Sequence, residues 1–257
     1  RARRYYDLTG GLGRAALLMH EVKQLLKEGK VRKAKSRAFE AAEEFRPVFM
    51  QPEHMLSDEE LMSFAEALVI SGQVEEAIPV LEEVEQRSLK YHFLVGTCYK
   101  ALGKKDDAIE AFRNAIKRYE YEQDLNSMVC LSFLNLSEIL MQKKQYLSAL
   151  TSLEVLLKNY PHKLDEDYPR YPLFVDDYVA DDALFLTGII NLILDRFPDG
   201  IVSLLKTQRY YPDLEYGKIV ASESEILIET MENKDWLFLD NLVNEFLDIY
   251  YEAHQLY

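Results

Sequence analysis

The sequence repeats a pattern of two amphipathic helices joined by a tight turn, and this repeat limits the fold more than any other feature. The pattern is clearest in residues 92–119, HFLVGTCYKALGKKDDAIEAFRNAIKRY. The small residues Gly96 and Ala108 let the two helices approach closely, while the rings of Tyr99 and Phe112 fill the space around them. A glycine after the first helix and aspartates at the start of the second are typical stop and start signals. The repeat therefore predicts a stack of helical hairpins.

Further stretches carry the same pattern at matching offsets, and the most N-terminal copy is the weakest. A small residue marks the packing position in the second helix of each copy, at 34, 77, 108, 149 and 200. These positions are 43, 31, 41 and 51 residues apart, so we expect helices or connectors of varying length. The residues predicted to pack the helices together are Gly96, Tyr99, Ala108, Phe112, Ala115, Ala77, Ala149, Gly188 and Gly200.

The order small residue–x2–aromatic, followed by Ala–x3–aromatic–x2–Ala, resembles the signature of the tetratricopeptide-repeat (TPR) family. The stretch from Gly96 to Ala115 matches nearly all of it, and the resemblance extends over about residues 15–212. Asn191 and Gly200 depart from the usual aromatic residue and alanine. The resemblance implies an all-α superhelical solenoid of about five helical hairpins, to which the sequence adds a C-terminal helical pair. A generic bundle of helical hairpins is the alternative.

We expect one TPR-like solenoid over residues 15–257, preceded by a flexible basic lead-in at residues 1–14. Ser57 and Glu60 have the spacing of a capping box at the start of the second copy. An insertion rich in proline and aromatic residues precedes the fifth copy. The predicted repeats are about 15–48, 58–88, 89–122, 130–163 and 181–214, with the insertion at 162–180 and C-terminal capping helices at 219–257.

The residue patterns that support catalysis are missing from the sequence. The five histidines are far apart, no HExxH pair is present for zinc, and no serine lies in a GxSxG turn. The glycines of residues 10–13 lack the lysine and hydroxyl of a phosphate-binding loop. Cys98 and Cys130 form no CxxC motif. We therefore expect no enzyme activity, no cofactor and no metal site.

Charge is divided unevenly between a basic N-terminal head and an acidic remainder. The net charge is −14, whereas residues 1–37 hold eleven Lys and Arg against three acids, a net of +8 that leaves −22 elsewhere. This acidity argues against nucleic acid as a partner. The head is expected to dock on an acidic surface, including that of a second copy, or on anionic lipid; a solvated helix face is the alternative. The basic patch consists of Lys30, Arg32, Lys33, Lys35 and Arg37.

In TPR proteins the first helices of successive repeats line a concave groove, and the resemblance implies such a groove here. The residue three positions before the small site of each first helix is apolar in every copy, which predicts an apolar ridge that binds an apolar helix or an extended peptide. Alternatively, the insertion or the C-terminal helices fold into the groove and bury the ridge. The predicted groove residues are Met62, Phe93, Leu134 and Phe185, together with Val69, Lys100, Met141 and Leu192 four positions after the small site.

We expect a non-enzymatic scaffold or adaptor that binds another protein. Cochaperone TPR proteins hold a chaperone tail with lysine and asparagine, and that subtype is disfavoured because the central groove positions are Glu66, Thr97, Glu138 and Ile189. A structural protein that self-assembles from basic head to acidic body, and a bacterial cell-envelope assembly protein, are the alternatives. A cytoplasmic location is favoured, and the periplasm stays open because the chain begins at Arg1 rather than Met.

Overall fold

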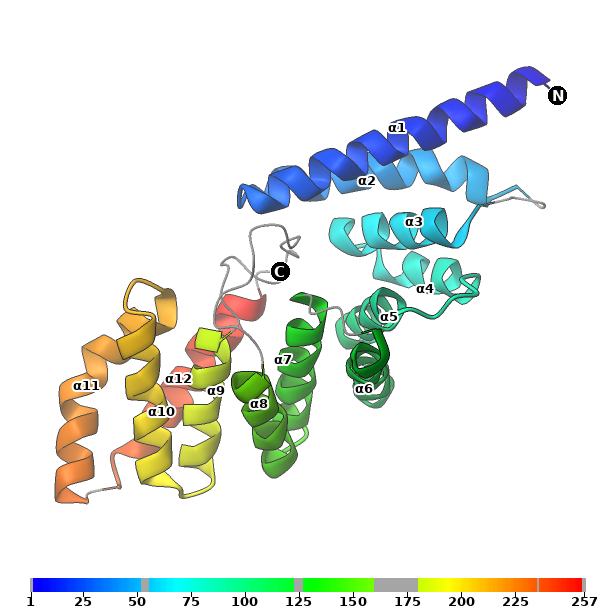
Figure 1. Cartoon of the computed structure of the whole chain (residues 1–257). Coiled ribbons are helices and arrows are strands. Elements are labelled where there is room, and N and C mark those ends of the chain that lie inside the picture. The colour runs from blue at the N-terminus through cyan, green and yellow to red at the C-terminus, as the bar shows by residue number, and fades with distance from the viewer. Residues whose placement is uncertain (1, 52–55, 123–126, 160–179, 235, 256–257) are drawn as a thin grey trace. The chain divides into compact units, whose positions relative to one another are not determined.

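The computed structural model describes residues 2–51, 56–122, 127–159, 180–234 and 236–255, and the regular secondary structure of these ranges is α-helical throughout (Figure 1). This confirms the predicted all-α fold. The predicted insertion, residues 162–180, lies outside the described residues except for its last residue. The helices are α1 (Ala2–Lys27), α2 (Val31–Phe49), α3 (Asp58–Ser71), α4 (Val74–Glu82), α5 (Leu89–Ala101), α6 (Lys105–Glu122), α7 (Ser127–Gln142), α8 (Tyr146–Asn159), α9 (Ala180–Ile193), α10 (Phe197–Tyr210), α11 (Glu215–Asn233) and α12 (Leu239–Gln255).

The described residues form two compact units, and the boundary between them falls within α7. Unit 1 contains α1 to α6 and the part of α7 that ends at Ser132, and unit 2 contains α7 from Phe133 onward and α8 to α12. In unit 1 each helix from α1 to α6 packs against the next, and the first helices α3 and α5 also touch. In unit 2 the same succession runs from α8 to α11. Packing between neighbours in the sequence is what a helical-repeat fold requires.

The first five hairpins close with the same turn. A residue one or two positions after each first helix has a left-handed backbone: φ is 68° at Gly29, 88° at Gly72, 70° at Gly103, 59° at Lys144 and 57° at Asp195. Two backbone amides then bond back to the helix, as in Lys144 N to Met141 O and Gln145 N to Leu140 O, both 2.8 Å. This is the hydrogen-bond pattern of a Schellman turn.

The irregular spacing of the repeats arises outside the turn region of the hairpins. From the second hairpin to the fifth, the small residues that face each other across a hairpin are twelve positions apart, as in Ala65 with Ala77 and Gly188 with Gly200. The second helices differ in length, since α4 has 9 residues and α6 has 18. The connectors between hairpins differ as well: residues 83–88 join α4 to α5, and residues 160–179 join α8 to α9. Helices and connectors of unequal length together account for the unequal distances between successive copies.

Close approach of the helices depends on the missing side chains of glycine. A Cβ atom on Gly96 would lie 2.8 Å from the ring of Phe112, and one on Gly188 would lie 2.6 Å from Leu204. Both distances are shorter than atoms in a packed interior tolerate. The alanines of the predicted packing set, Ala77, Ala108, Ala115 and Ala149, are fully buried.

Helix α1 begins earlier than expected, because residues 2–14, predicted as a flexible lead-in, are helical. The glycines at 10, 11 and 13 suggested flexibility since glycine disfavours helix. The later part of α1 packs against the following helices, with Ala15, Val22 and Leu26 buried, whereas none of residues 10–14 is buried. Tertiary contacts thus stabilise the later part of α1, and the glycine-containing residues continue that helix.

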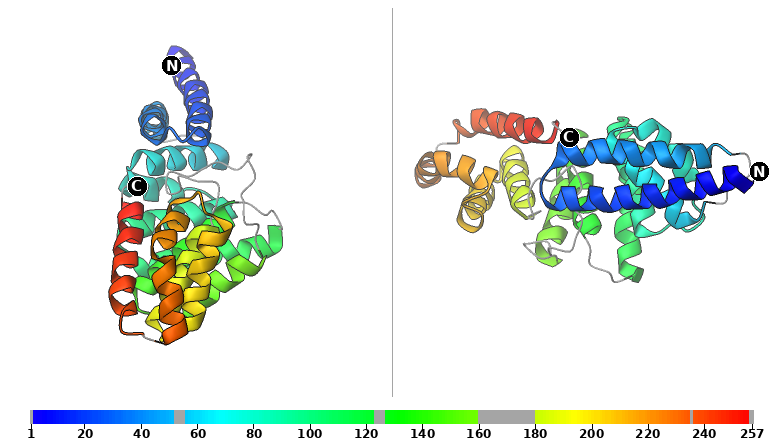
Figure 2. Two further views of the ribbon diagram at one scale, coloured as in Figure 1. Left: turned by 90° about the vertical axis from the view of Figure 1, so that its left-hand side faces the viewer. Right: turned by 90° about the horizontal axis from the view of Figure 1, so that it is seen from above.

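The C-terminal helices depart from the hairpin arrangement. Helix α11 packs on α10 and α9, whereas α12 turns back and packs on α9 (Figure 2). One side of α12 carries Leu239, Leu242, Phe246 and Tyr250, none more than 2% exposed. Their spacing of three or four residues puts them on one helical face, which is the face that α12 buries.

Candidate protein-binding site

The predicted groove residues lie on the first helices of the hairpins, but most of them are buried. The pairs fall on α3, α5, α7 and α9 in order. Val69 and Lys100 are half-buried. The prediction of an open apolar ridge is therefore wrong at the other six positions, whose exposed fractions are 7% for Met62, 1% for Phe93, 0% for Leu134, 0% for Phe185, 4% for Met141 and 3% for Leu192.

Helical geometry explains the burial in unit 1. Residues three apart on a helix share a face, so the residue three positions before the small site faces the same way as that site. The small site faces the partner helix of its own hairpin. Phe93 accordingly points towards α6, where its ring centroid lies 6.2 Å from that of Phe112. In unit 1 the residues three positions before the small sites therefore lie in the hairpin core.

In unit 2 the inner helix face is covered by α12. The ring of Phe185 stacks on Tyr216 of α11 at 4.4 Å and packs against Phe246 and Tyr250 of α12 at 5.2 and 6.4 Å between centroids. The alternative in which the C-terminal helices bury the ridge therefore describes unit 2. An amphipathic helix of the chain itself occupies the place expected for a partner.

A polar contact that the sequence did not reveal anchors α12. The Tyr250 hydroxyl donates a 2.6 Å hydrogen bond to Glu138 Oε1 on α7, across 112 residues of sequence. Burial, followed by the nearby charges of Glu138 and Asp182, raises the pKa of Tyr250 far above its ordinary value. The phenol therefore stays protonated and remains a donor. Glu138 and Asp182 are themselves 3% and 5% exposed.

Unit 1 has a similar polar contact at the matching position of α3. Glu66 follows the small residue Ala65, just as Glu138 follows Ser137. Its Oε2 atom lies 2.6 Å from Lys90 Nζ of α5, and its side chain is only 3% exposed. At both central positions an internal partner holds the carboxylate, so neither glutamate is presented to an incoming ligand.

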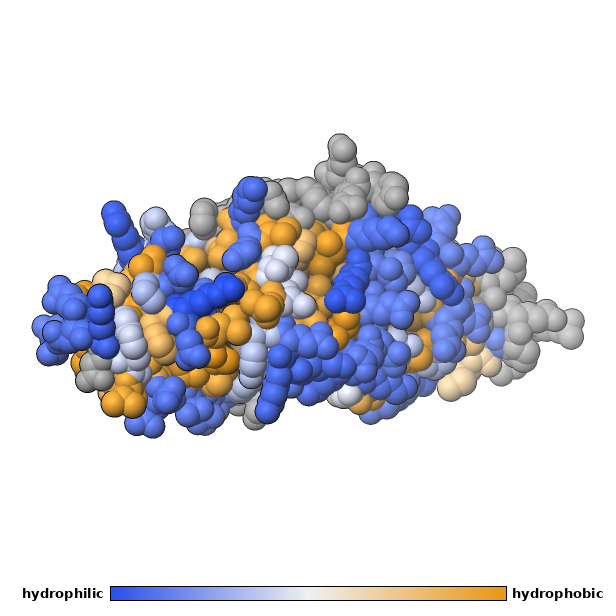
Figure 3. All heavy atoms as spheres, turned by 90° about the horizontal axis from the view of Figure 1, so that it is seen from below, coloured by the Kyte–Doolittle hydropathy of each residue, from blue (hydrophilic) through white to orange (hydrophobic). Residues whose placement is uncertain are grey.

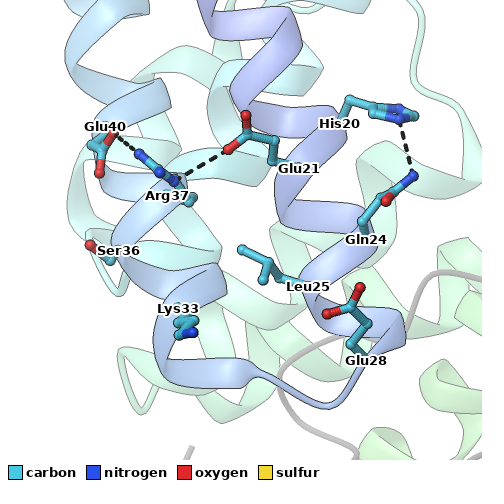
Figure 4. Close-up of a pocket in the computed structure, with 9 residues that line it drawn as sticks. All are labelled: His20, Glu21, Gln24, Leu25, Glu28, Lys33, Ser36, Arg37 and Glu40. Atoms are coloured by element: carbon cyan, nitrogen blue, oxygen red, sulfur yellow. Dashed lines mark hydrogen bonds and ion pairs between the residues drawn. The ribbon is translucent and has the colours of Figure 1, made fainter.

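The predicted basic patch is partly neutralised by carboxylates on the same hairpin. Arg37 bonds Glu40 at 2.6 Å and Glu21 at 3.3 Å beside a surface hollow of about 560 Å³ between α1 and α2 (Figure 4). Lys30 pairs with Glu28 at 2.6 Å. Three members, Arg32, Lys33 and Lys35, have no ion pair with another described residue. The patch is weaker than its composition predicts.

Exposed apolar side chains occur away from the predicted columns. On the face drawn in Figure 3, apolar patches alternate with charged residues. The turn before α12 contains Leu237, which is 86% exposed, and Trp236, whose ring stacks on Phe197 at 5.0 Å. The sequence signal for these side chains is the run WLFL at residues 236–239, which lies outside the repeat positions used to predict the groove.

Comparison with known proteins agrees with the hairpin geometry. A family model described as tetratricopeptide repeat matches residues 92–120 and 131–162, which correspond to α5 with α6 and α7 with α8. The chain contains tetratricopeptide repeats. The other hairpins of this TPR-containing chain repeat the same turn, and those of α3 with α4 and α9 with α10 repeat the same twelve-residue spacing.

Two curated relatives share a longer stretch with this TPR-containing chain. They are the SPbeta prophage-derived glycosyltransferase SunS of Bacillus subtilis (strain 168) and glycosyltransferase SunS of Bacillus phage SPbeta. Each is 25% identical over 143 residues, which is 54% of this chain and 33% of the relative. The chain thus spans about a third of the length of the relatives it matches.

In the part of the chain that the structure describes, two features are absent: a helix that could span a membrane and a group of side chains that could bind a metal ion. None of the described helices is both long and apolar enough to cross a membrane. The described residues also contain no group of three or more His, Cys, Asp and Glu side chains placed to hold a metal ion.

Proposed function

We propose that this TPR-containing chain is a non-enzymatic adaptor that binds a helix or extended peptide of another protein on the inner helices of unit 1. The observation that supports it most is the packing of α12 in unit 2. There the inner face of a repeat helix takes an amphipathic helix, through Phe246 and Tyr250 against Phe185. Equivalent helices in unit 1 are suited to the same kind of ligand, supplied by another chain.

Fewer of the predicted groove residues are accessible in unit 1 than an open ridge would require. Val69 on α3 and Lys100 on α5 are half-buried, whereas Met62 and Phe93 are in the core. A partner would therefore meet an aliphatic side chain and a basic one, and Asp at Phe93 would unfold the hairpin instead of reporting on binding.

The test is affinity capture by the full chain with three variants compared. We expect Val69→Asp and Lys100→Glu to lose a partner that wild type retains, while Leu147→Asp, on the 59% exposed position of α8, keeps it. All three should keep the helical circular-dichroism spectrum. Equal recovery of the partner by wild type and both inner-face variants would exclude this surface.

The relatives support a second candidate, in which the chain works beside a glycosyltransferase activity. Their names assign that activity to proteins about three times as long as the aligned stretch. The adaptor proposal expects no hydrolysis of nucleotide sugars by the purified chain, assayed by release of the nucleoside diphosphate. Turnover above a heat-denatured control would show that this chain is an enzyme.

A further inference from the structure

The open end of the α5–α6 hairpin carries a small pocket with an unusual charge. His92 of α5 and Asn114, Lys117 and Arg118 of α6 line a surface hollow of about 300 Å³. The two helices are antiparallel, so the first turn of α5 lies beside the last turns of α6. This brings together residues that are 22 to 26 positions apart in the sequence.

Positive charge collects at this pocket, whose described lining residues include no carboxylate. Lys117 and Arg118 make no ion pair with another described residue, and no acid is among the four lining residues. A third cation, Arg87, lies over the ring of Tyr91 at 5.7 Å and acts electrostatically on His92. Two other cations of unit 1, Arg46 and Lys90, do have carboxylate partners.

His92 adds hydrogen-bonding capacity to the pocket but no charge. It is half-buried, and its pKa is lowered by that burial and by the positive charges of Arg118 and Arg87. The imidazole is therefore neutral at neutral pH. An anion in the pocket would oppose the two guanidinium groups and raise the pKa of His92, which makes this histidine a reporter of binding.

We propose that this pocket binds a phosphate monoester carried by a phosphorylated side chain of the protein partner. This proposal rests on the proposed adaptor function. Phosphate carries up to two negative charges and three acceptor oxygens, which suits the two cations of the lining, Lys117 and Arg118, better than a single carboxylate does. The planar guanidinium of Arg118 can donate two hydrogen bonds to phosphate oxygens, and Asn114 supplies an amide donor.

Other phosphate-bearing ligands fit less well. A nucleotide base stacks on aromatic rings, and among the lining residues only the His92 imidazole is aromatic. Nucleic acid would meet the acidic remainder of the chain, whose net charge of −22 outweighs the +8 of residues 1–37. A single phosphorylated side chain presents the charge without either difficulty.

The experiment titrates the full chain with a capped peptide that contains one phosphoserine, followed by calorimetry and by the proton resonances of its five histidines. The variant His92→Gln assigns the reporter resonance. We expect the phosphopeptide to bind and to raise the pKa of His92, and the same peptide with unmodified serine to do neither. Inorganic phosphate alone should bind more weakly.

Variants of helix α6 provide the matched comparison. Arg118→Gln and Lys117→Gln should each weaken phosphopeptide binding roughly tenfold, while Arg113→Gln, an exposed cation of the same helix outside the lining, should leave it unchanged. Equal binding of both peptides, equal binding by Arg118→Gln, or binding of inorganic phosphate without the phosphopeptide would overturn the proposal. The phosphopeptide titration needs no natural partner. Failure of phosphopeptide binding can therefore be told apart from failure of partner capture by the inner-face surface at Val69 and Lys100.

Discussion

At Gly96 the packing of a hairpin depends on the absence of a methyl group. A Cβ atom there would lie 2.8 Å from the ring of Phe112, and that ring is itself held by Phe93. We expect Gly96→Ala to lower the free energy of unfolding by about 1–3 kcal/mol, measured by urea denaturation. Gly13→Ala is the control: its Cβ has open space in α1, so the same change should stabilise by about 0.5–1 kcal/mol. An unchanged free energy of unfolding in Gly96→Ala would mean that the ring of Phe112 has room to move.

Two hairpin turns use a non-glycine residue where the backbone favours glycine. Lys144 has φ of 59° and Asp195 has φ of 57°. Lys144→Gly should raise the free energy of unfolding by up to about 1 kcal/mol, because it removes the Cβ strain of the left-handed conformation. Asp195→Gly should raise the free energy of unfolding less, since aspartate tolerates the left-handed conformation. Gly103→Ala, with φ of 70°, is the reverse test and should destabilise. Thermal denaturation of the three variants checks the order.

Both cysteines are buried in apolar surroundings, and burial raises the pKa of each thiol to about 12. At pH 8 only about one thiol in ten thousand is ionised at such a pKa. We expect no reaction of native protein with a thiol reagent at pH 8, and reaction of two thiols in denaturant. Because the thiol pKa is higher in the folded state than in the unfolded state, the buried thiols contribute fully to the free energy of unfolding below pH 9. They lose that contribution as the pH rises towards 12, so stability should fall over this interval. Rapid labelling of native Cys98 would contradict its burial.

Sequence reasoning at this scale succeeded for packing geometry and failed for exposure. The small residues and the twelve-residue spacing are local features, so a single hairpin such as Gly96 with Ala108 reveals them. The position of Phe93 also follows from helical geometry, since a residue three positions before a packing site shares its face. The bond between Tyr250 and Glu138 was out of reach because it joins residues 112 apart.

At the scale of the element, most helices could be predicted and the termini could not. Strong local signals mark the internal helices: Ser57 and Glu60 form the expected capping box at α3, with the Glu60 amide 3.3 Å from Ser57 Oγ and the Ser57 amide 2.8 Å from Glu60 Oε2. Helix α1 and the placement of α12 depend on packing partners, which no local pattern names. The resemblance to TPR proteins supplied the hairpin order but not the helix that covers the inner face.

Removal of α12 tests its role in unit 2. A chain that ends at residue 234 would expose Phe185 and Tyr216, and each large buried side chain contributes about 1.5–3 kcal/mol. We expect increased binding of a hydrophobic dye and a lower melting temperature. A synthetic peptide of residues 236–257 should restore both, and the same peptide with Phe246→Asp should not. An unchanged melting temperature would show that α12 is dispensable to the unit.

At the scale of the whole molecule, charge distribution distinguishes an adaptor from a self-assembling protein. The head of the chain is basic and the remainder acidic, but Arg37 and Lys30 already pair with Glu40, Glu21 and Glu28. Exposed ion pairs are weak and are screened by salt. We expect the sedimentation coefficient to stay the same at low and high salt. An oligomer that dissociates as salt is added would favour assembly from head to body.

The bond from Tyr250 to Glu138 also bears on how the chain is made. Unit 1 joins helices that follow one another, so its contacts can form as the nascent chain leaves the ribosome. In unit 2, Phe185 and Glu138 contact α12, which follows them in the sequence by more than fifty residues. Until α12 has been synthesised, the surfaces of α7 and α9 that it covers stay exposed. That interval is when chaperones or proteases would encounter this protein.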